Sequence, residues 1–378
     1  MIRSTVAHVD LNALQKNFRA IRDFLSINTL PAATPPGIIA VVKANAYGHG
    51  AERAALALEQ AGATMLAVAD IEEGIGLRRA GVHVPVLIFG ALSVSDLEGL
   101  FEFNLTTTIS TPSAARAVQA AAARARRTIG YHLKIDTGMN RLGFRHDNLR
   151  RTLPELLSSA NLRLEAIYTH FATADEPGSE LFDLQRVRFE SSLAIASELG
   201  AKPIVRHAAN SAALLRDSRV WYDVVRPGLL LYGIVPPPLA STIPLEPVMS
   251  LTSRVVAVKG MRSGEGIGYG WRYKAEAPAT VAVIPAGYAD GIDTRLSGRG
   301  SVLIRGKRVP IVGSVCMDMM MVDVTGLDVA PGDEVVIIGR QGDESWQQID
   351  AREMAASIGT IPWEVVCRIG TRIERQYE

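Results

Sequence analysis

The chain has 378 residues, enough for two domains with hydrophobic cores, and 48% of its residues are hydrophobic. Its 40 basic and 39 acidic residues give a formal net charge of +1, so no charge excess indicates a nucleic-acid partner. Two cysteines, no signal-peptide pattern and no run of about 18 apolar residues predict a cytoplasmic protein without a disulfide framework or a membrane partner.

An amphipathic helix is predicted over residues 11–30, where Leu14, Phe18, Ile21 and Leu25 recur at spacings of three and four. Short apolar runs typical of buried strands then alternate with helix-like stretches, several of them rich in alanine. These runs cover residues 38–44, 65–70, 84–90, 105–110, 129–136, 164–171, 204–209 and 223–233. Eight strands alternating with helices favour an α/β fold with a (β/α)₈ TIM-type barrel. A doubly wound open sheet is the alternative.

The alternation stops near residue 234, where a proline-rich segment over 235–247 predicts a domain boundary. Short strands with glycine turns follow, including a hairpin around Gly306-Lys307. We therefore expect a barrel domain over 1–240 and a mostly β C-terminal domain over 241–378.

Polar residues fall at or just after the ends of the predicted barrel strands. They are Lys43, Lys134, Asp136, His170, His207, Asn210, Ser211 and Arg226. Because chemistry in such barrels lies at the C-terminal ends of the strands, these side chains are predicted to share one pocket. Each also has an ordinary structural interpretation. A strand-end lysine can be solvated, a histidine can be a satisfied core residue, Ser211 can be an N-cap and Arg226 can belong to a turn.

Two positions near the last barrel strands indicate an anion site. A serine at a helix start, Ser211, and a glycine just after a strand, Gly228, can present backbone N–H groups to a phosphate. The loops after the seventh and eighth strands of such barrels often bind phosphate. A lysine and a phosphate site in one pocket favour pyridoxal 5′-phosphate (PLP), which attaches to a lysine amine.

Eight sequence blocks together resemble the alanine racemase family. They are AVVKANAYGHG (40–50), HLKIDTGMNRLGF (132–144), IYTHFATAD (167–175), RHAANSAA (206–213), VVRPGLLLYG (224–233), IGYGWRY (267–273), PAGYADGI (285–292) and GSVCMDMMMVDV (313–324). The blocks occur in the family's order and cover both predicted domains. The family fold is a barrel followed by a β domain.

The resemblance implies that Lys43 holds PLP covalently and acts as one catalytic base. The other base would be Tyr269 from the partner subunit of a homodimer. Arg226 would contact the pyridine nitrogen, and His170 would lie between Arg226 and Tyr269. The phosphate would be held by Tyr47, Ser211, Gly228 and Leu229.

The resemblance also implies how the substrate is bound. Arg141 would bind the carboxylate of alanine with its planar fork, helped by the backbone at Met317. Lys134 would be carbamylated and would orient Arg141. Tyr288 would line the substrate entrance.

These roles imply interconversion of L-alanine and D-alanine, which supplies D-alanine for bacterial peptidoglycan. A base on each face of the Cα atom is the simplest way to remove a proton and return one on the other side. Tyrosine has a reference pKa of about 10 and needs environmental help to act as a base. Arginine is always protonated, so the ring nitrogen beside Arg226 should stay unprotonated.

One position departs from the family pattern. Near the C-terminus the family usually has a tyrosine before a glutamate, which contacts the phosphate and narrows the entrance. Here the segment is IPWEVVC, and Trp363 takes that place. An indole N–H can donate a hydrogen bond but cannot accept one, so the tyrosine's role is not transferred to Trp363.

Other motifs in the chain are weaker. Asp136-Thr137-Gly138 is the tripeptide of aspartic proteases, but their site needs two carboxylates and only one such tripeptide occurs. The glycine-rich segment 264–270 is not a dinucleotide fingerprint. No H-E-x-x-H motif or paired C-x-x-C occurs, so no metal is predicted. Cys316 can be a nucleophile, but a packed structural thiol is preferred.

Two competing functions stay open. The first is a non-catalytic PLP-binding protein built on a related barrel alone, which the second domain with Tyr269 and Met317 argues against. The second is another PLP enzyme of this fold, either a decarboxylase or a racemase for serine or a larger amino acid. The blocks typical of the decarboxylases are not found. Pocket width decides the substrate, and the sequence does not give it.

Overall fold

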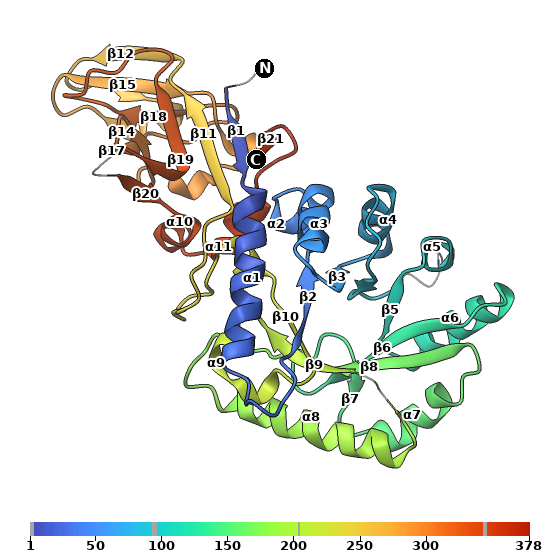
Figure 1. The fold of residues 1–378 in the computed structure, drawn as a ribbon. Helices are drawn as coiled ribbons and strands as arrows, with labels where there is room; N and C mark the ends of the chain where they lie inside the picture. Colours follow the sequence, from blue (N-terminus) through green and yellow to red (C-terminus); the bar gives the residue numbers. More distant parts are fainter. Residues whose placement is uncertain (1–3, 93–96, 203–204, 343–345) are drawn as a thin grey trace. The chain divides into compact units, whose positions relative to one another are not determined.

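The computed structural model describes residues 4–92, 97–202, 205–342 and 346–378 (Figure 1). The chain forms two compact units, which are described separately. The barrel unit comprises Leu14–Ala46 and Ala51–Leu245. The β unit comprises the residues up to Ala13, the short segment Tyr47–Gly50, and Glu246–Glu378.

Eight parallel strands of the barrel unit pair in a closed ring. In ring order they are β2 (Gly37–Val41), β3 (Met65–Val68), β4 (Val86–Ile88), β5 (Thr106–Ile109), β6 (Ile129–Asp136), β8 (Leu162–Tyr168), β9 (Val205–Asn210) and β10 (Val224–Arg226). The ring closes where β10 pairs with β2 through Val224 and Gly37. The predicted barrel is confirmed, and the open-sheet alternative is wrong because no edge remains between these strands. The predicted run 204–209 begins at Ile204, which lies outside the described residues.

Helices follow most of the barrel strands, and Figure 1 shows the longest of them, α8, along the outside of the barrel. They are α1 (Leu11–Ile27), α3 (Ala51–Gln60), α4 (Ile71–Arg79), α5 (Glu98–Glu102), α6 (Pro112–Arg124), α7 (Leu149–Leu157), α8 (Glu180–Glu198) and α9 (Ser211–Arg216). The amphipathic prediction for α1 is confirmed, since Leu14, Phe18, Ile21 and Leu25 are all buried. In α6, Thr111 caps the first turn by accepting the Ala114 N–H.

The β unit is built on a ten-stranded sheet in the described part of the chain. Its strands are β1 (Val6–Val9), β11 (Met249–Arg254), β12 (Ala257–Met261), β15 (Ala279–Ile284), β16 (Ser301–Ile304), β17 (Lys307–Val312), β18 (Met320–Asp323), β19 (Glu334–Gln341), β20 (Gln347–Ile349) and β21 (Glu374–Tyr377). The ribbon β13 (Gly266–Ile267) with β14 (Tyr273–Lys274) and the helices α10 (Ala351–Ile358) and α11 (Pro362–Cys367) complete the unit. The predicted hairpin is present between β16 and β17, with Arg305 and Gly306 at its turn.

The N-terminal strand belongs to the β unit rather than to the barrel. β1 pairs antiparallel with β11 and parallel with β21, so it lies between two C-terminal strands of the sheet. Its four residues have a nearly continuous apolar pattern, and Val6, Ala7 and Val9 are buried. The passage from the barrel unit to the β unit falls between Leu245 and Glu246, within the proline-rich segment 235–247.

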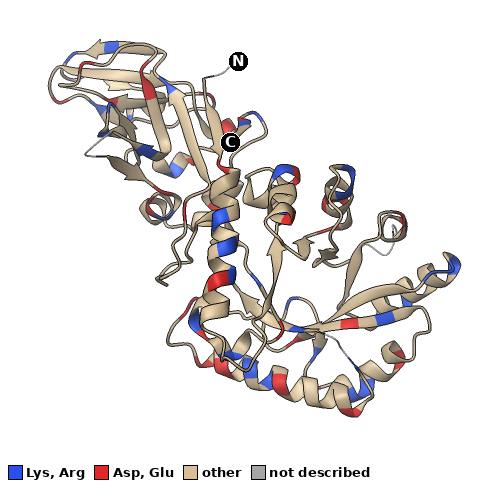
Figure 2. Ribbon diagram, viewed as in Figure 1, with Lys and Arg blue, Asp and Glu red and all other residues tan. Residues whose placement is uncertain are grey.

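Charged residues of both signs are mixed along the outer helices, as Figure 2 shows for α8. On that helix Arg186 pairs with Asp183 and with Glu190, one turn away in either direction. Such partly exposed pairs contribute little stability and keep the outer surface polar. None of the helices in the described ranges is both long and apolar enough to cross a membrane.

Candidate active site

Lys43 follows the end of β2 and begins an unusual turn, labelled α2 (Lys43–Tyr47) in Figure 1. The four residues Ala44–Tyr47 have φ between 52° and 54°, which is the left-handed region. For residues other than glycine this conformation costs roughly 1–2 kcal/mol each, and such strain collects at functional sites. The predicted strand over 38–44 therefore runs too far, because β2 ends at Val41.

Side-chain acceptors hold this turn within the barrel unit. The Ala44 N–H donates to Glu73 Oε1 at 2.6 Å, and the Ala51 N–H donates to Asn45 Oδ1 at 2.8 Å. Glu73 also accepts the Ala69 N–H at the end of β3, at 2.8 Å. One carboxylate thus ties the backbone after Lys43 to the neighbouring strand of the barrel.

Lys134 is a buried lysine near the end of β6, only 6% exposed. Burial lowers its pKa to about 8, and the nearby charges of Arg141, Arg226 and Lys43 act in the same direction. The carboxylate of Asp136 opposes this shift. About one-tenth of Lys134 is therefore the neutral, nucleophilic amine at pH 7, far more than for an ordinary lysine.

Asp136 ends β6 and shapes the loop that leads to Arg141. Its Oδ1 accepts the N–H groups of Gly138 and Asn140, each at 3.0 Å. These bonds explain the Asp136-Thr137-Gly138 tripeptide as a turn that leads to Arg141, an exposed residue. The charge of Arg141 acts on Lys134, Tyr168 and His170, so the loop brings this guanidinium to the same end of the barrel.

Arg226, the last residue of β10, is 3% exposed. It donates from Nη2 to the carbonyls of Thr169 and Ala208, each at 2.8 Å, and lies 3.3 Å from His170 Nδ1. Burial lowers its pKa to about 10. The pKa of His170 lies well below its ordinary value because the ring is buried, with the Arg226 charge the next cause, so this imidazole is neutral.

Ser211 is the first residue of α9, and the N-cap is Asn210, whose side chain accepts the Ala213 N–H. The N-cap interpretation of Ser211 is therefore wrong. Its buried Oγ instead accepts the Gly228 N–H at 3.0 Å and the Leu230 N–H at 3.4 Å. With both lone pairs used, the Ser211 hydroxyl proton is left to donate to a further acceptor.

Four cations converge at this end of the barrel. They are Lys43, Lys134, Arg141 and Arg226, whose charges act together on the pKa values of Lys134 and His170, and Asp136 is the one carboxylate among those causes. Such a concentration of positive charge with buried donors suits a ligand that carries several negative charges. A phosphate group and a carboxylate are ligands of this kind.

In the β unit, Tyr269 begins a short 3₁₀ turn and is 77% exposed. The residues on either side of it, Gly268 and Gly270, have φ of 66° and 72°, which glycine adopts without strain. The Ser314 hydroxyl donates to the Tyr269 carbonyl at 3.1 Å. The backbone of Tyr269 is therefore fixed while its phenol ring is directed to solvent in the single chain.

Tyr288 and Met317 lie close together in the β unit. The Tyr288 N–H donates to the Cys316 carbonyl at 2.9 Å, and the Ala289 N–H donates to the Met317 carbonyl at 3.0 Å. Tyr288 and Met317 are 46% and 53% exposed. The half-buried Cys316 thiol lies 3.4 Å from the Ser314 carbonyl oxygen, to which it can donate.

Two further predicted residues lie in the β unit. Tyr47 is half-buried, and His49 Nδ1 lies 3.0 Å from its carbonyl oxygen. Trp363 is half-buried in the first turn of α11.

Two family models match nearly the whole chain. The N-terminal domain of alanine racemase matches residues 9–236, and the C-terminal domain of alanine racemase matches residues 248–377. The chain belongs to the alanine racemase family. It is thus an enzyme of the isomerase class, and the predicted family resemblance is confirmed.

Similar proteins agree with this assignment. The alanine racemase of Symbiobacterium thermophilum is 42% identical over 378 residues, which cover 100% of this chain and 97% of that protein. The crystal structure of alanine racemase from Streptomyces lavendulae has a TM-score of 0.92 and 35% identity, covering 100% of this chain and 98% of that chain. That from Bartonella henselae, with covalently bound pyridoxal phosphate, has a TM-score of 0.87 and 28% identity, covering 99% of each chain.

Three residues beside the cation cluster of this alanine racemase family member were missed or given no role from sequence. His132 lies two residues before Lys134 on β6, so both side chains point to the same side of the strand. The two-residue spacing from Lys134 could have identified His132 from the sequence. The sequence identifies His207 only as a strand-end residue and gives Tyr168 no role. Both lie against Arg226.

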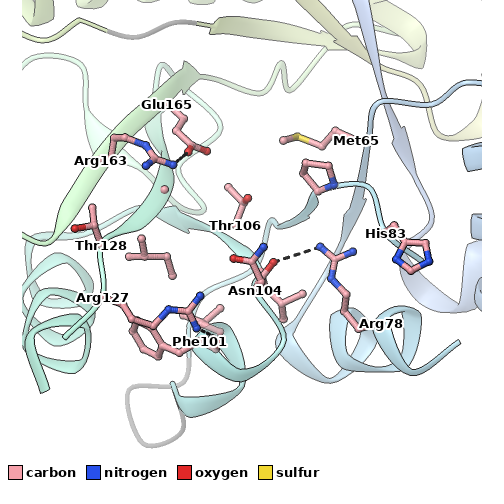
Figure 3. Close-up of a pocket in the computed structure, with 15 residues that line it drawn as sticks. Met65, Arg78, His83, Phe101, Asn104, Thr106, Arg127, Thr128, Arg163 and Glu165 are labelled. Atoms are coloured by element: carbon pink, nitrogen blue, oxygen red, sulfur yellow. Dashed lines mark hydrogen bonds and ion pairs between the residues drawn. The ribbon is translucent and has the colours of Figure 1, made fainter. Parts of the chain in front are cut away.

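A cavity of about 270 Å³ lies at the opposite end of the barrel, where the strands begin (Figure 3). None of the predicted site residues lines it. Arg78 at its edge donates to four backbone carbonyls, those of Val82, Val84, Phe103 and Asn104, at 2.7–3.3 Å. These bonds tie together the connections between strands and helices, and stability is the usual role of this barrel end.

Proposed function

We propose that this enzyme is a PLP-dependent alanine racemase that interconverts L-alanine and D-alanine. The observation that carries the proposal is the convergence of Lys43, Lys134, Arg141 and Arg226 at the C-terminal end of the barrel with one carboxylate among them. A ligand with a phosphate and a substrate with a carboxylate would offset this charge. The family membership and the PLP bound by the Bartonella henselae relative support the same assignment.

The geometry at Ser211 and Arg226 fits PLP. Lys43 would hold it covalently, and Tyr47, Ser211, Gly228 and Leu229 would hold its phosphate. The proton left on the buried Ser211 hydroxyl suits a phosphate oxygen, which only accepts. Arg226 Nε has no acceptor among the residues that the structure describes and can donate to a ring nitrogen. Bound PLP would supply an electron sink that makes the Cα proton of alanine acidic.

Two bases on opposite faces of the substrate would move the proton. Lys43 would take or return it on one face, and Tyr269 of the partner subunit would do so on the other. Exposure of Tyr269, Tyr288 and Met317 in the single chain supports a homodimer that completes the site. The neutral His170 has its Nδ1 facing the Arg226 guanidinium, so its proton would be on Nε2, which could donate to a phenol oxygen and favour the phenolate form of a tyrosine base.

Arg141 and the Met317 backbone would bind the alanine carboxylate. We expect Lys134 to be carbamylated: its neutral amine attacks CO₂, a C–N bond forms, and one proton leaves to solvent. The product carries one negative charge in place of the lysine's positive charge. It would pair with Arg141 and reduce the charge imbalance around the site.

The biological role proposed is supply of D-alanine for peptidoglycan in the cytoplasm of a bacterium. Both cysteines are free, which agrees with a reducing compartment. Tyr288 would line the entrance through which alanine reaches the site. Trp363 would also affect the shape of this entrance, because its indole is bulkier than the tyrosine that the family usually has there.

The first test is to incubate purified enzyme with L-alanine in D₂O and measure D-alanine formation and deuterium at Cα. We expect D-alanine and Cα deuterium, together with the visible absorbance of lysine-bound PLP. Absorbance without alanine racemisation would move the assignment to serine, to a larger amino acid or to a PLP-binding protein. No absorbance after added PLP would contradict the cofactor.

A second test addresses the shared site. Tyr269→Phe should retain the PLP absorbance and lose racemisation, because the phenol oxygen that moves the proton is gone. Mixing Tyr269→Phe with Lys43→Ala under conditions of subunit exchange should restore activity, since a mixed dimer contains one complete site. Normal racemisation by Tyr269→Phe would mean that the second base lies elsewhere.

A further inference from the structure

Two buried imidazoles extend from Arg226 into the barrel. His207 Nδ1 lies 2.9 Å from Arg226 Nη1, and His207 Nε2 lies 3.0 Å from His132 Nδ1. His207 has no exposed surface and His132 is 3% exposed. None of the steps proposed above uses either ring.

These two contacts determine which ring nitrogens carry protons. A guanidinium only donates hydrogen bonds, so His207 Nδ1 must accept from Arg226 and cannot carry a proton. The neutral His207 ring then has its proton on Nε2, which donates to His132 Nδ1. Burial also lowers the pKa of both histidines, that of His132 to about 3, so neither ring adds a charge near Arg226.

Tyr168 prevents the His207 ring from turning. Its phenol ring stacks on His207 with centroids 4.6 Å apart and planes inclined by 10°. The Tyr168 hydroxyl lies 3.0 Å from Thr108 Oγ1, which fixes the tyrosine in turn. The Arg226 guanidinium lies 5.3 Å from the same phenol ring. His207 therefore presents a lone pair to Arg226 in one orientation.

The lone pair of His207 restricts the guanidinium as well. Two carbonyls bind Nη2, and His207 binds Nη1 on the other arm of the fork. Because a guanidinium is planar, fixing both arms also fixes the direction of its Nε–H. That N–H is the donor assigned above to the pyridine nitrogen.

We propose that His207 is a positioning residue that holds Arg226 through its Nδ1 lone pair, with His132 accepting the Nε2 proton. The inference rests on the proposed function, since it concerns the donor offered to the cofactor. It predicts one tautomer for both rings, with the proton on Nε2. It also predicts that an acceptor at the Nδ1 position of residue 207 matters more than the ring itself.

Histidine tautomers test the proton assignment without any variant. Two-bond ¹⁵N–¹H correlation spectra of ¹⁵N-histidine-labelled enzyme distinguish Nδ1–H, Nε2–H and doubly protonated rings. His207→Phe and His132→Phe assign the two signals. We expect both rings to be Nε2–H at pH 7. A proton on His207 Nδ1, or a charged His207, would overturn the proposal even if the enzyme racemises alanine.

Substitutions of His207 test the positioning role. His207→Asn places an amide oxygen near the former Nδ1, His207→Gln places its polar group near the former Nε2, and His207→Phe removes both. We expect His207→Asn to keep kcat within about 10-fold of wild type, while His207→Gln and His207→Phe lose about 10²-fold. The PLP absorbance of the latter two should shift, because the ring nitrogen loses its oriented donor.

The outcomes separate this proposal from a packing effect and from the proposed function. Equal loss in His207→Asn and His207→Phe, or wild-type kcat in His207→Phe, would contradict positioning. Phe189→Leu is the control, because this buried ring on α8 is outside the imidazole chain and should lower Tm without changing kcat. If wild-type enzyme does not racemise alanine, the proposed function fails while the tautomer measurement stays interpretable.

Discussion

Each end of the barrel holds an arginine, the half-buried Arg78 at one end and the buried Arg226 at the other, and the two differ in what surrounds them. At the end where the strands begin, four carbonyls accept hydrogen bonds from Arg78 and Glu59 adds an opposing charge. At the end where the strands finish, Arg226 contacts two carbonyls and two neutral imidazoles. The first arginine holds loops together. The second has an Nε–H with no acceptor among the residues that the structure describes, and this is the donor proposed above for the cofactor.

The two ends of the barrel also differ in how their charged side chains are paired. Around the cavity in Figure 3, Arg163 pairs with Glu165 at 2.6 Å, and Arg127 donates to the Phe101 carbonyl. At the other end the charges of Lys43, Arg141 and Arg226 lower the pKa values of Lys134 and His170, and Asp136 opposes them at Lys134. Paired charges serve the fold, whereas a cluster of like charges costs stability and is typical of functional sites.

The largest expected effect is the loss of Lys43. Lys43→Ala removes the amine proposed to hold PLP and to act as a base, so racemisation should fall to background and the visible absorbance should disappear. Turnover with L-alanine and an absorbance spectrum after adding PLP measure both. Lys259→Ala, on the exposed strand β12, is the matched control and should behave as wild type. Retained racemisation by Lys43→Ala would remove the basis of the assignment.

The next-largest effect on kcat is expected for Arg226, in contrast to Arg78 at the other end of the barrel. Arg226→Lys should lower kcat by about 10²-fold or more, since lysine cannot reproduce the planar fork. Arg78→Met should leave kcat unchanged and lower the free energy of unfolding by about 3 kcal/mol, because four carbonyls lose a charged donor. Steady-state kinetics and denaturant unfolding of both variants provide the measurement. If both variants lose kcat and stability to the same extent, the two barrel ends do not differ in role.

Much of this arrangement could be predicted from the sequence. The eight apolar runs correspond to the eight barrel strands because strands buried on both faces read as continuous apolar segments. Lys43, Lys134, His170 and Arg226 stood out because polar residues at the ends of such runs are conspicuous. Their roles in binding or catalysis stay predictions until variants are measured.

Other features depend on contacts that one sequence does not show. β1 joins the β unit because its partners are β11 and β21, more than 200 residues away along the chain. The left-handed turn after Lys43 includes two alanines and an asparagine, and alanine does not favour that conformation. It persists where Glu73 accepts the Ala44 N–H and the Asn45 side chain accepts the Ala51 N–H, and hydrophobic periodicity does not reveal either bond.

A smaller effect is expected in the pH dependence of stability. The pKa of Lys134 is about 8 in the folded enzyme against 10.5 for an ordinary lysine, so the unfolded chain binds more protons between these values. Lys134 therefore lowers the free energy of unfolding below pH 8, and this penalty vanishes as the pH rises toward 10.5, so stability increases over that range. Lys134→Met should remove this increase in stability. Unfolding free energies in bicarbonate-free buffer from pH 7 to 10.5 measure it, and identical slopes for both proteins would contradict the lowered pKa.

Carbamylation of Lys134 would change that result in a defined direction. Adding ¹³C-bicarbonate near pH 8 should give a carbamate carbon signal in wild type that is absent from Lys134→Met. The negative carbamate would then stabilise the folded enzyme beside Arg141. A wild-type protein that gains no signal and no stability with bicarbonate would leave Lys134 as a neutral amine in the site.

The smallest expected effect belongs to the end where the strands begin. Glu165 is the extra residue of a bulge in β8, and its carboxylate lies where a Cβ atom on Gly130 would be, 2.1 Å from Oε1. In Gly130→Ala the carboxylate must move away. A glutamate tip is flexible, its ion pair with Arg163 is partly exposed, and alanine suits a strand better than glycine. We therefore expect the free energy of unfolding to change by less than about 1 kcal/mol and kcat to stay unchanged.

Combining Gly130→Ala with Glu165→Ala should cancel whatever loss of stability occurs, because the overlapping carboxylate is gone. A fall in kcat in Gly130→Ala would mean instead that β6 transmits a disturbance from Gly130 to Lys134, four residues along the same strand, and that the two ends of the barrel are not independent.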